Sequence, residues 1–217
     1  MLARLVLKEI RESLWIVAAA LAAYVYYFMT ATGVGLGGEE WWHWLSFLRG
    51  GDEPGFGLVV SLCLAAGLGL RQTVGESARG TFQFLLHRPA SRERLIATKL
   101  VVGAGLYLCL ATVPLWLIAW WATTPGNAPA PFEWSMLAGS WKIWSSMTIM
   151  YFGAFLTGLR PGRWYGTRLL PLIACGFVSV GLSFLPHWWI TGLPITVVLD
   201  VLLVTNILFV ARTRDYS

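Results

Sequence analysis

Long runs of apolar residues, separated by short polar segments, make up most of this 217-residue chain. A helix needs roughly 20 apolar residues to cross a hydrocarbon core about 30 Å thick. Runs that meet or approach this length predict membrane-spanning helices at residues 14–36, 55–72, 100–122 and 135–159. The pattern therefore indicates an integral membrane protein built from α-helices.

A longer apolar run covers residues 169–210 and contains one acidic residue, Asp200. As a single helix this run would be about 63 Å long, twice the thickness of the hydrocarbon core. Pro186 and His187 interrupt it near its middle, which predicts two further spans at residues 169–185 and 188–210. The sequence thus predicts an all-α membrane protein with six transmembrane helices in one domain, residues 1–217.

Composition and charge agree with this layout. The chain is 57% hydrophobic and 12% charged, whereas about a quarter of the residues of a soluble domain are charged. Six spans place every Lys and Arg on one face except Arg49 and Lys142. Because cytoplasmic loops carry the excess of Lys and Arg, both termini are expected in the cytoplasm. The net charge of +5 then reflects topology, and no nucleic-acid partner is expected.

Two amphipathic segments are predicted to lie along the membrane. Residues 2–13 place Leu2, Val6 and Ile10 on one face and charged side chains on the other, which predicts a cytoplasmic interfacial helix. On the outer side, residues 39–48 concentrate three Trp in a stretch that is too short to cross the bilayer. This stretch is interpreted as an interfacial anchor, and the alternative is a lid that faces the substrate.

A charged segment, residues 76–99, separates the second span from the third. Three apolar residues at helical spacing predict a ridge on a short helix: Phe82, Leu85 and Leu86. Pro89 ends that helix, and Ser91 is a suitable N-cap for a second helix that continues through Lys99 into the third span. The segment is interpreted as a cytosolic docking surface for a partner. The alternative is a basic loop whose apolar ridge rests on the membrane.

This segment resembles the corresponding loop in the six-helix permease subunits of type-2 ABC (ATP-binding-cassette) exporters. In that family the loop carries an acidic residue, a basic-Gly-Thr triplet, two apolar positions, a Pro, a Ser-Arg pair and a Lys that enters the third span. The matching residues here are Glu76, Arg79, Gly80, Thr81, Phe82, Leu85, Leu86, Pro89, Ser91, Arg92 and Lys99. The amphipathic N-terminal helix and the short basic tail are also similar to that family.

The resemblance implies a subunit that pairs with a second copy or a related permease and docks two copies of an ABC ATP-binding subunit. The implied coupling residues are Glu76, Arg79, Gly80, Thr81, Phe82, Leu85, Leu86, Pro89 and Arg92. The chain has no G-x-x-x-x-G-K-[ST] phosphate loop, so ATP hydrolysis is expected from the partner and not from this chain. The expected location is the bacterial cytoplasmic (inner) membrane.

Asp200 is a candidate intramembrane polar site, because a charged group within a span costs several kcal/mol. One interpretation is a contact that faces the substrate path or the dimer interface, with Thr205 or Asn206 of the same helix. The alternative is a structural aspartate that is protonated, hydrogen-bonded or brought to water by a displaced helix. No metal or cofactor is expected, since all three cysteines lie inside predicted spans and are interpreted as packing residues.

Three rival classes of function follow from the same pattern. A membrane-embedded enzyme would need a nucleophile, paired carboxylates or a metal cluster within the spans, and none is evident. An autonomous transporter or channel would normally carry several intramembrane ionisable groups or internal repeats. A non-transporting scaffold for an ATPase stays open, because the docking segment fits it equally well.

Overall fold

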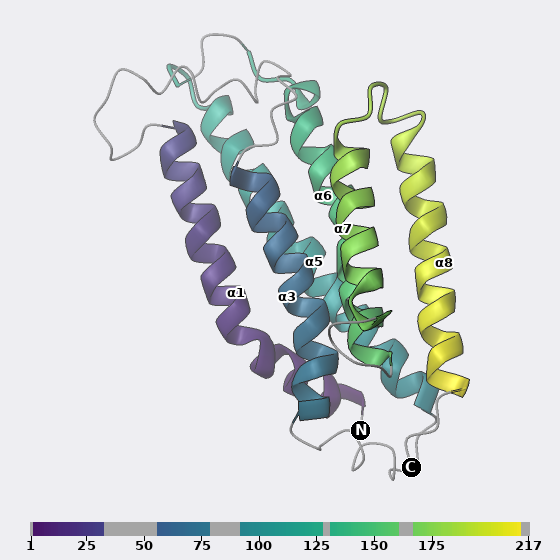
Figure 1. The fold of residues 1–217 in the computed structure, drawn as a ribbon. Helices are drawn as coiled ribbons and strands as arrows, with labels where there is room; N and C mark the ends of the chain where they lie inside the picture. The colour runs from purple at the N-terminus through teal and green to yellow at the C-terminus, as the bar shows by residue number, and fades with distance from the viewer. Residues whose placement is uncertain (1, 33–55, 79–91, 128–130, 161–166, 214–217) are drawn as a thin grey trace.

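The computed structural model describes residues 2–32, 56–78, 92–127, 131–160 and 167–213. This part of the chain folds into helices joined by turns and contains no strand (Figure 1), so the predicted all-α class is confirmed. The helices are α1 (Leu2–Thr32), α3 (Phe56–Ala78), α5 (Arg92–Thr123), the short 3-10 helix η2 (Trp134–Leu137), α6 (Ala138–Leu159), α7 (Leu170–Ser183) and α8 (Gly192–Thr213).

Four of these helices are long and apolar enough to cross a membrane: α1, α3, α5 and α8. The other two predicted spans differ from them for separate reasons. Helix α7 has 14 residues, about 21 Å of helix, and is shorter than the hydrocarbon core. Helix α6 has 22 residues, but its first half carries the polar side chains of Lys142, Ser145 and Ser146. Length and composition thus support four of the six predicted spans.

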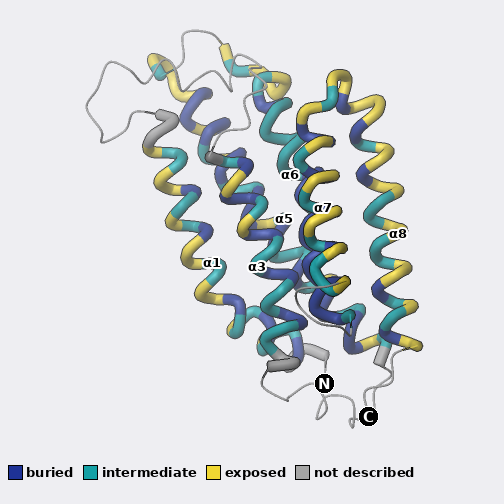
Figure 2. The backbone as a smooth tube through the Cα atoms, viewed as in Figure 1, coloured by how far each residue is buried: buried dark blue, intermediate teal, exposed yellow. Residues whose placement is uncertain are grey.

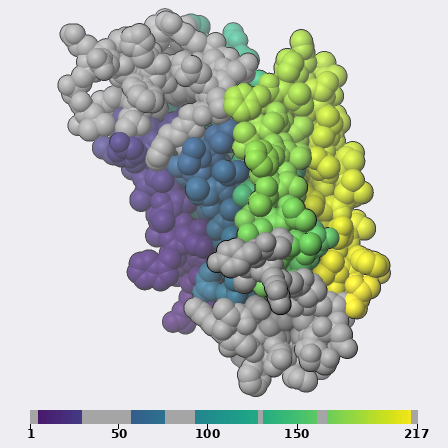
Figure 3. Space-filling model, in the orientation of Figure 1, coloured from purple at the N-terminus to yellow at the C-terminus, as the bar shows by residue number. Residues whose placement is uncertain are grey.

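Helix α6 lies at the centre of the bundle, which explains how it tolerates polar residues. It packs against α3, α5, α7 and α8, and it buries nearly every residue from Ser145 to Leu159 (Figure 2). Helices α1 and α8 are instead exposed along their outer faces (Figures 2 and 3). The large side chains exposed there and on α7 include Trp15, Phe177 and Phe209, as expected for surfaces that face lipid.

The chain reverses between α7 and α8, where the predicted interruption at Pro186 and His187 is confirmed. His187 has a φ of 53°, in the left-handed region, and its carbonyl oxygen accepts hydrogen bonds from the amides of Ile190 and Thr191. The turn brings α8 back antiparallel to α7. The beginning of α1 and the end of α8 therefore lie at the same end of the bundle (Figure 1).

Residues 2–13 were predicted as a separate interfacial helix, but they form the first turns of α1 without a break. This end of α1 bends inward under the bundle (Figure 1). The side chains that it buries are Leu5, Glu9 and Ser13. The buried face is thus offset from the predicted apolar face of Val6 and Ile10, because Glu9 has a partner inside the bundle. The predicted anchor at residues 39–48 lies outside the described residues.

Candidate functional site

The predicted docking residues belong to the segment that joins α3 to α5. Glu76 lies in the last turn of α3, and Arg92 is the first residue of α5. The other predicted docking residues lie outside the described part of the chain: Arg79, Gly80, Thr81, Phe82, Leu85, Leu86 and Pro89. What the structure does describe is the pair of helices that carry this segment and the contacts between them.

Lys99 of α5 forms a buried ion pair with Glu9 of α1, in which Lys99 Nζ lies 2.9 Å from Glu9 Oε1. The two side chains are only 3% and 2% exposed. Taking two charges out of water costs several kcal/mol per ion, and a buried pair recovers this only with close geometry and further hydrogen bonds. The pair therefore fixes the bent end of α1 against α5.

Gln72 of α3 is joined to Lys99 by two reciprocal hydrogen bonds. Gln72 Nε2 donates to the Lys99 carbonyl oxygen at 3.1 Å, and Lys99 Nζ donates to the Gln72 carbonyl oxygen at 3.4 Å. Each residue thus uses its side chain to hold the backbone of the other. These bonds connect α3 and α5 close to the ends from which the predicted docking segment leaves.

Tyr151 brings the central helix α6 into the same group. Its hydroxyl donates to Gln72 Oε1 at 2.8 Å and lies 3.1 Å from the Leu100 carbonyl oxygen. Gly103 leaves the space for this contact, because a Cβ at that position would collide with Gln72 Oε1 and the Tyr151 hydroxyl. We call Glu9, Gln72, Lys99 and Tyr151 the Lys99 cluster. It joins α1, α3, α5 and α6 through buried polar contacts.

Partly exposed ion pairs surround the cluster at the same end of the bundle. Glu12 of α1 lies 3.8 Å from Lys8 of the same helix and 3.8 Å from Arg71 of α3. Arg212 near the end of α8 makes a two-point contact with Glu93 near the beginning of α5, with distances of 2.8 and 3.0 Å. Exposed pairs contribute at most about 1 kcal/mol. These exposed pairs therefore add little to the stability that the buried cluster provides.

The second candidate site, Asp200 with Asn206, is not assembled in the structure. Asp200 Oδ2 contacts Thr148 Oγ1 of α6 at 2.6 Å, so its partner lies on another helix. Asn206 is exposed, and the Thr205 hydroxyl donates to the Val201 carbonyl oxygen of its own helix. In the structure the hydrogen-bond partner of Asp200 is thus Thr148, and its role at a substrate path or dimer interface stays a prediction.

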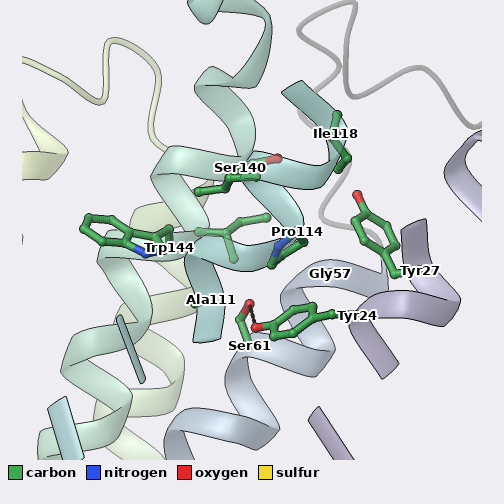
Figure 4. Close-up of a pocket in the computed structure, with 11 residues that line it drawn as sticks. Tyr24, Tyr27, Gly57, Ser61, Ala111, Pro114, Ile118, Ser140 and Trp144 are labelled. Atoms are coloured by element: carbon green, nitrogen blue, oxygen red, sulfur yellow. Dashed lines mark hydrogen bonds between the residues drawn. The ribbon is translucent and has the colours of Figure 1, made fainter. Parts of the chain in front are cut away.

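A small cavity lies between α1, α3, α5 and α6 (Figure 4). Tyr24 and Ser61, whose hydroxyls are 3.0 Å apart, line it together with Tyr27, Pro114 and Trp144. Its volume of about 40 Å³ can hold water, since one water needs about 10–15 Å³ on the same measure.

Metal chemistry has no visible basis in the described part of the chain. No group of three or more His, Cys, Asp or Glu side chains lies close enough there to hold a metal ion. Within the Lys99 cluster, the ammonium group of Lys99 and the carboxylate of Glu9 contact each other. The cluster is therefore suited to holding helices together, and we assign it a mechanical role.

The sequence reasoning identified Lys99 only as part of the docking motif and missed Glu9, Gln72 and Tyr151. One signal was present in the sequence. Glu9 and Lys99 are opposite charges at corresponding ends of two predicted helices, and Gln72 is an amide at the end of a third. A buried charge requires a partner, so these residues are natural candidates for one another.

Comparison with known proteins adds no family assignment. No protein-family model, curated protein or solved structure matches this chain. The functional argument therefore depends on the sequence pattern and on the geometry of the Lys99 cluster.

Proposed function

We propose that this chain is the membrane-spanning subunit of an ATP-driven ABC exporter. In this role it forms the translocation path and docks a separate ATP-binding subunit through residues 76–99. The observation that carries the proposal is the reciprocal pair of bonds between Gln72 and Lys99. These bonds join α3, which precedes the docking segment, to α5, which follows it. The docking segment is where an ATPase would apply force.

The proposed topology has six spans with both termini in the cytoplasm. Helix α6 crosses the membrane inside the bundle, where α3, α5, α7 and α8 separate its polar residues from lipid. Helix α7 crosses together with the turn that follows it, which carries the exposed Trp189, a residue type that is enriched at membrane interfaces. The excess of Lys and Arg at the other end supports placing that end in the cytoplasm.

The proposed mechanism is mechanical coupling. Closure of two ATP-binding subunits moves the docking segments of two permease copies. Because the Gln72 and Lys99 bonds join α3 to α5, the two helices move together and do not slide past each other. Glu9 and Tyr151 pass the displacement to α1 and α6. Packed helices of this kind shift between discrete arrangements, so a movement at the cytoplasmic end changes the path between them.

The docking segment is tested by replacing Leu85 with Asp. A carboxylate buried without a partner in an interface costs about 2–5 kcal/mol, so the affinity for the ATP-binding subunit should fall at least about 30-fold. The measurement is the amount of P-loop ATPase that purifies with the tagged full-length chain in mild detergent. Leu85→Met is the matched control, because it keeps an apolar side chain of similar volume and should retain the ATPase.

A scaffold without transport activity would pass the same binding test. ATPase activity separates the two functions, because an exporter's hydrolysis responds to its substrate and a scaffold's does not. Normal ATPase recovery with Leu85→Asp would remove residues 76–99 from the docking site.

A further inference from the structure

The contacts around Thr148 of α6 constrain the protonation state of Asp200. Thr148 Oγ1 lies 2.6 Å from Asp200 Oδ2 and 2.7 Å from the carbonyl oxygen of Ser145. Both distances are those of full hydrogen bonds, since O–H···O contacts range over about 2.5–3.0 Å and are most often about 2.7–2.8 Å. A hydroxyl carries a single hydrogen, so Thr148 can donate fully to only one of these two oxygens.

An ionised Asp200 leaves this arrangement one hydrogen short. The carboxylate and the Ser145 carbonyl are both acceptors, so one short contact would hold two oxygens together with no hydrogen between them. If Thr148 shared its hydrogen between the two acceptors, both contacts would be weak and long. Neither contact is long. A proton on Asp200 Oδ2 removes the conflict. Asp200 then donates to Thr148, and Thr148 donates to Ser145.

The surroundings of Asp200 also favour the neutral form. Within the described residues, no Lys, Arg or His makes an ion pair with it. Its other oxygen, Oδ1, is buried without a hydrogen-bond partner. An unpaired carbonyl oxygen of a neutral acid costs far less to bury than an unpaired oxygen of a carboxylate. Nearby apolar side chains of α6 and α8 include Ile149, Leu199 and Leu203.

The helices packed against α8 supply no nearby positive charge. The titratable groups near Asp200 on the neighbouring helices include Tyr107 of α5 and Cys175 of α7. Both are neutral acids in their ordinary state. The cation of α6 closest in sequence to Thr148 is Lys142, which lies six residues earlier, about 9 Å along the helix axis. On α8 itself, Arg212 lies twelve residues after Asp200, about 18 Å along the axis.

We infer that Asp200 is a proton-binding site within the membrane and that its proton fastens α8 to the central helix α6. The ligand is a proton, held as the Oδ2–H bond of a neutral carboxylic acid that donates to Thr148. On release, the Oδ2–H bond breaks and the proton passes to water. The Thr148 hydrogen then turns from the Ser145 carbonyl to the carboxylate. The α6–α8 contact is left with a charge among apolar side chains, so release loosens α8.

The decisive variant is Asp200→Asn, because the Asn amide donates to Thr148 as the protonated acid does and cannot be ionised. Thermal unfolding of the full chain in detergent is followed from about pH 5 to about pH 8. A folded state that binds one more proton than the unfolded state loses stability as the pH rises, by up to tenfold per pH unit in the unfolding equilibrium. We expect this loss in the wild type and expect Asp200→Asn to lack it.

Glu93→Gln is the matched control, since it neutralises an exposed, ion-paired acid in the first turn of α5 and should keep the wild-type loss of stability with rising pH. The inference is overturned if the wild type keeps or gains stability relative to Asp200→Asn as the pH rises, because the folded state would then bind no extra proton.

Infrared spectroscopy of the wild type gives a second test that needs no stable variant. A neutral carboxylic acid has a C=O stretching band that a carboxylate lacks. Labelling the chain with carbon-13 aspartate should shift such a band in the folded protein at neutral pH. Where Thr148→Val folds, the same band should move, because Asp200 has lost its hydrogen-bond acceptor. A folded wild type with no label-sensitive acid band overturns the inference.

Discussion

Replacing Lys99 with Met is expected to destabilise the folded chain by about 3–5 kcal/mol, which is the usual cost of removing one partner from a buried ion pair. The Glu9 carboxylate would stay 2% exposed without the ammonium group that pairs with it. The Gln72 carbonyl oxygen would also lose its side-chain donor. Met is similar to Lys in length and flexibility, so the change removes the charge and leaves the packing nearly intact.

The double variant Glu9→Gln with Lys99→Met separates this cause from a general loss of packing. With both charges removed, most of the stability should return, and the double-mutant cycle should give a large coupling energy. Lys8→Met is the matched control, because Lys8 is 34% exposed and lies 3.8 Å from Glu12, a geometry worth at most about 1 kcal/mol. The free energy of unfolding in detergent is measured for the wild type, the two single variants Glu9→Gln and Lys99→Met, the double variant and the Lys8→Met control. Equal losses for Lys99→Met and Lys8→Met would contradict the buried pair.

Replacing Gly69 with Ala is expected to separate α3 from α6 and to cost about 1–3 kcal/mol, the usual effect of overpacking. A Cβ at Gly69 would lie 2.6 Å from the Tyr151 carbonyl oxygen and 2.9 Å from the Phe155 amide nitrogen. Both atoms belong to the backbone, so they cannot rotate away, and the helices have to move apart. That displacement would also stretch the contact between Tyr151 and Gln72.

Gly105→Ala provides the matched control within the same bundle. A Cβ at Gly105 has no atom within 4 Å, and Ala is favoured over Gly in a helix by about 1 kcal/mol. The two identical substitutions should therefore change the melting temperature in opposite directions, with Gly69→Ala lowering it. A Gly69→Ala protein as stable as Gly105→Ala would show that α3 and α6 are not in close contact at this position.

Much of the fold could be predicted, because the lengths of apolar runs and the positions of Pro residues are local properties of the sequence. The reversal at Pro186 and His187 is one example, since no helix of that length fits a bilayer. Helix α6 is a helix whose position hydropathy alone does not predict. Hydropathy measures how apolar a segment is, whereas the polar residues of α6 are acceptable because other helices surround it.

The Lys99 cluster could not be predicted from local patterns. Glu9 and Lys99 are separated by 90 residues in the sequence, and the predicted apolar face of residues 2–13 took no account of that distant partner. The Thr148 partner of Asp200 could not be predicted either. Side chains five and six residues apart on a helix do not face each other, so Thr205 and Asn206 were poorly placed to contact it, and only the packing of α6 on α8 brings in Thr148.

Purification of the full-length chain from its native membranes in mild detergent shows whether an ATPase is bound to it. Mass spectrometry would identify and count the proteins that remain bound. We expect a P-loop ATPase, with two copies for each pair of permease chains, and ATP hydrolysis by the complex. A chain that purifies without an ATPase under every solubilisation condition would contradict the exporter proposal.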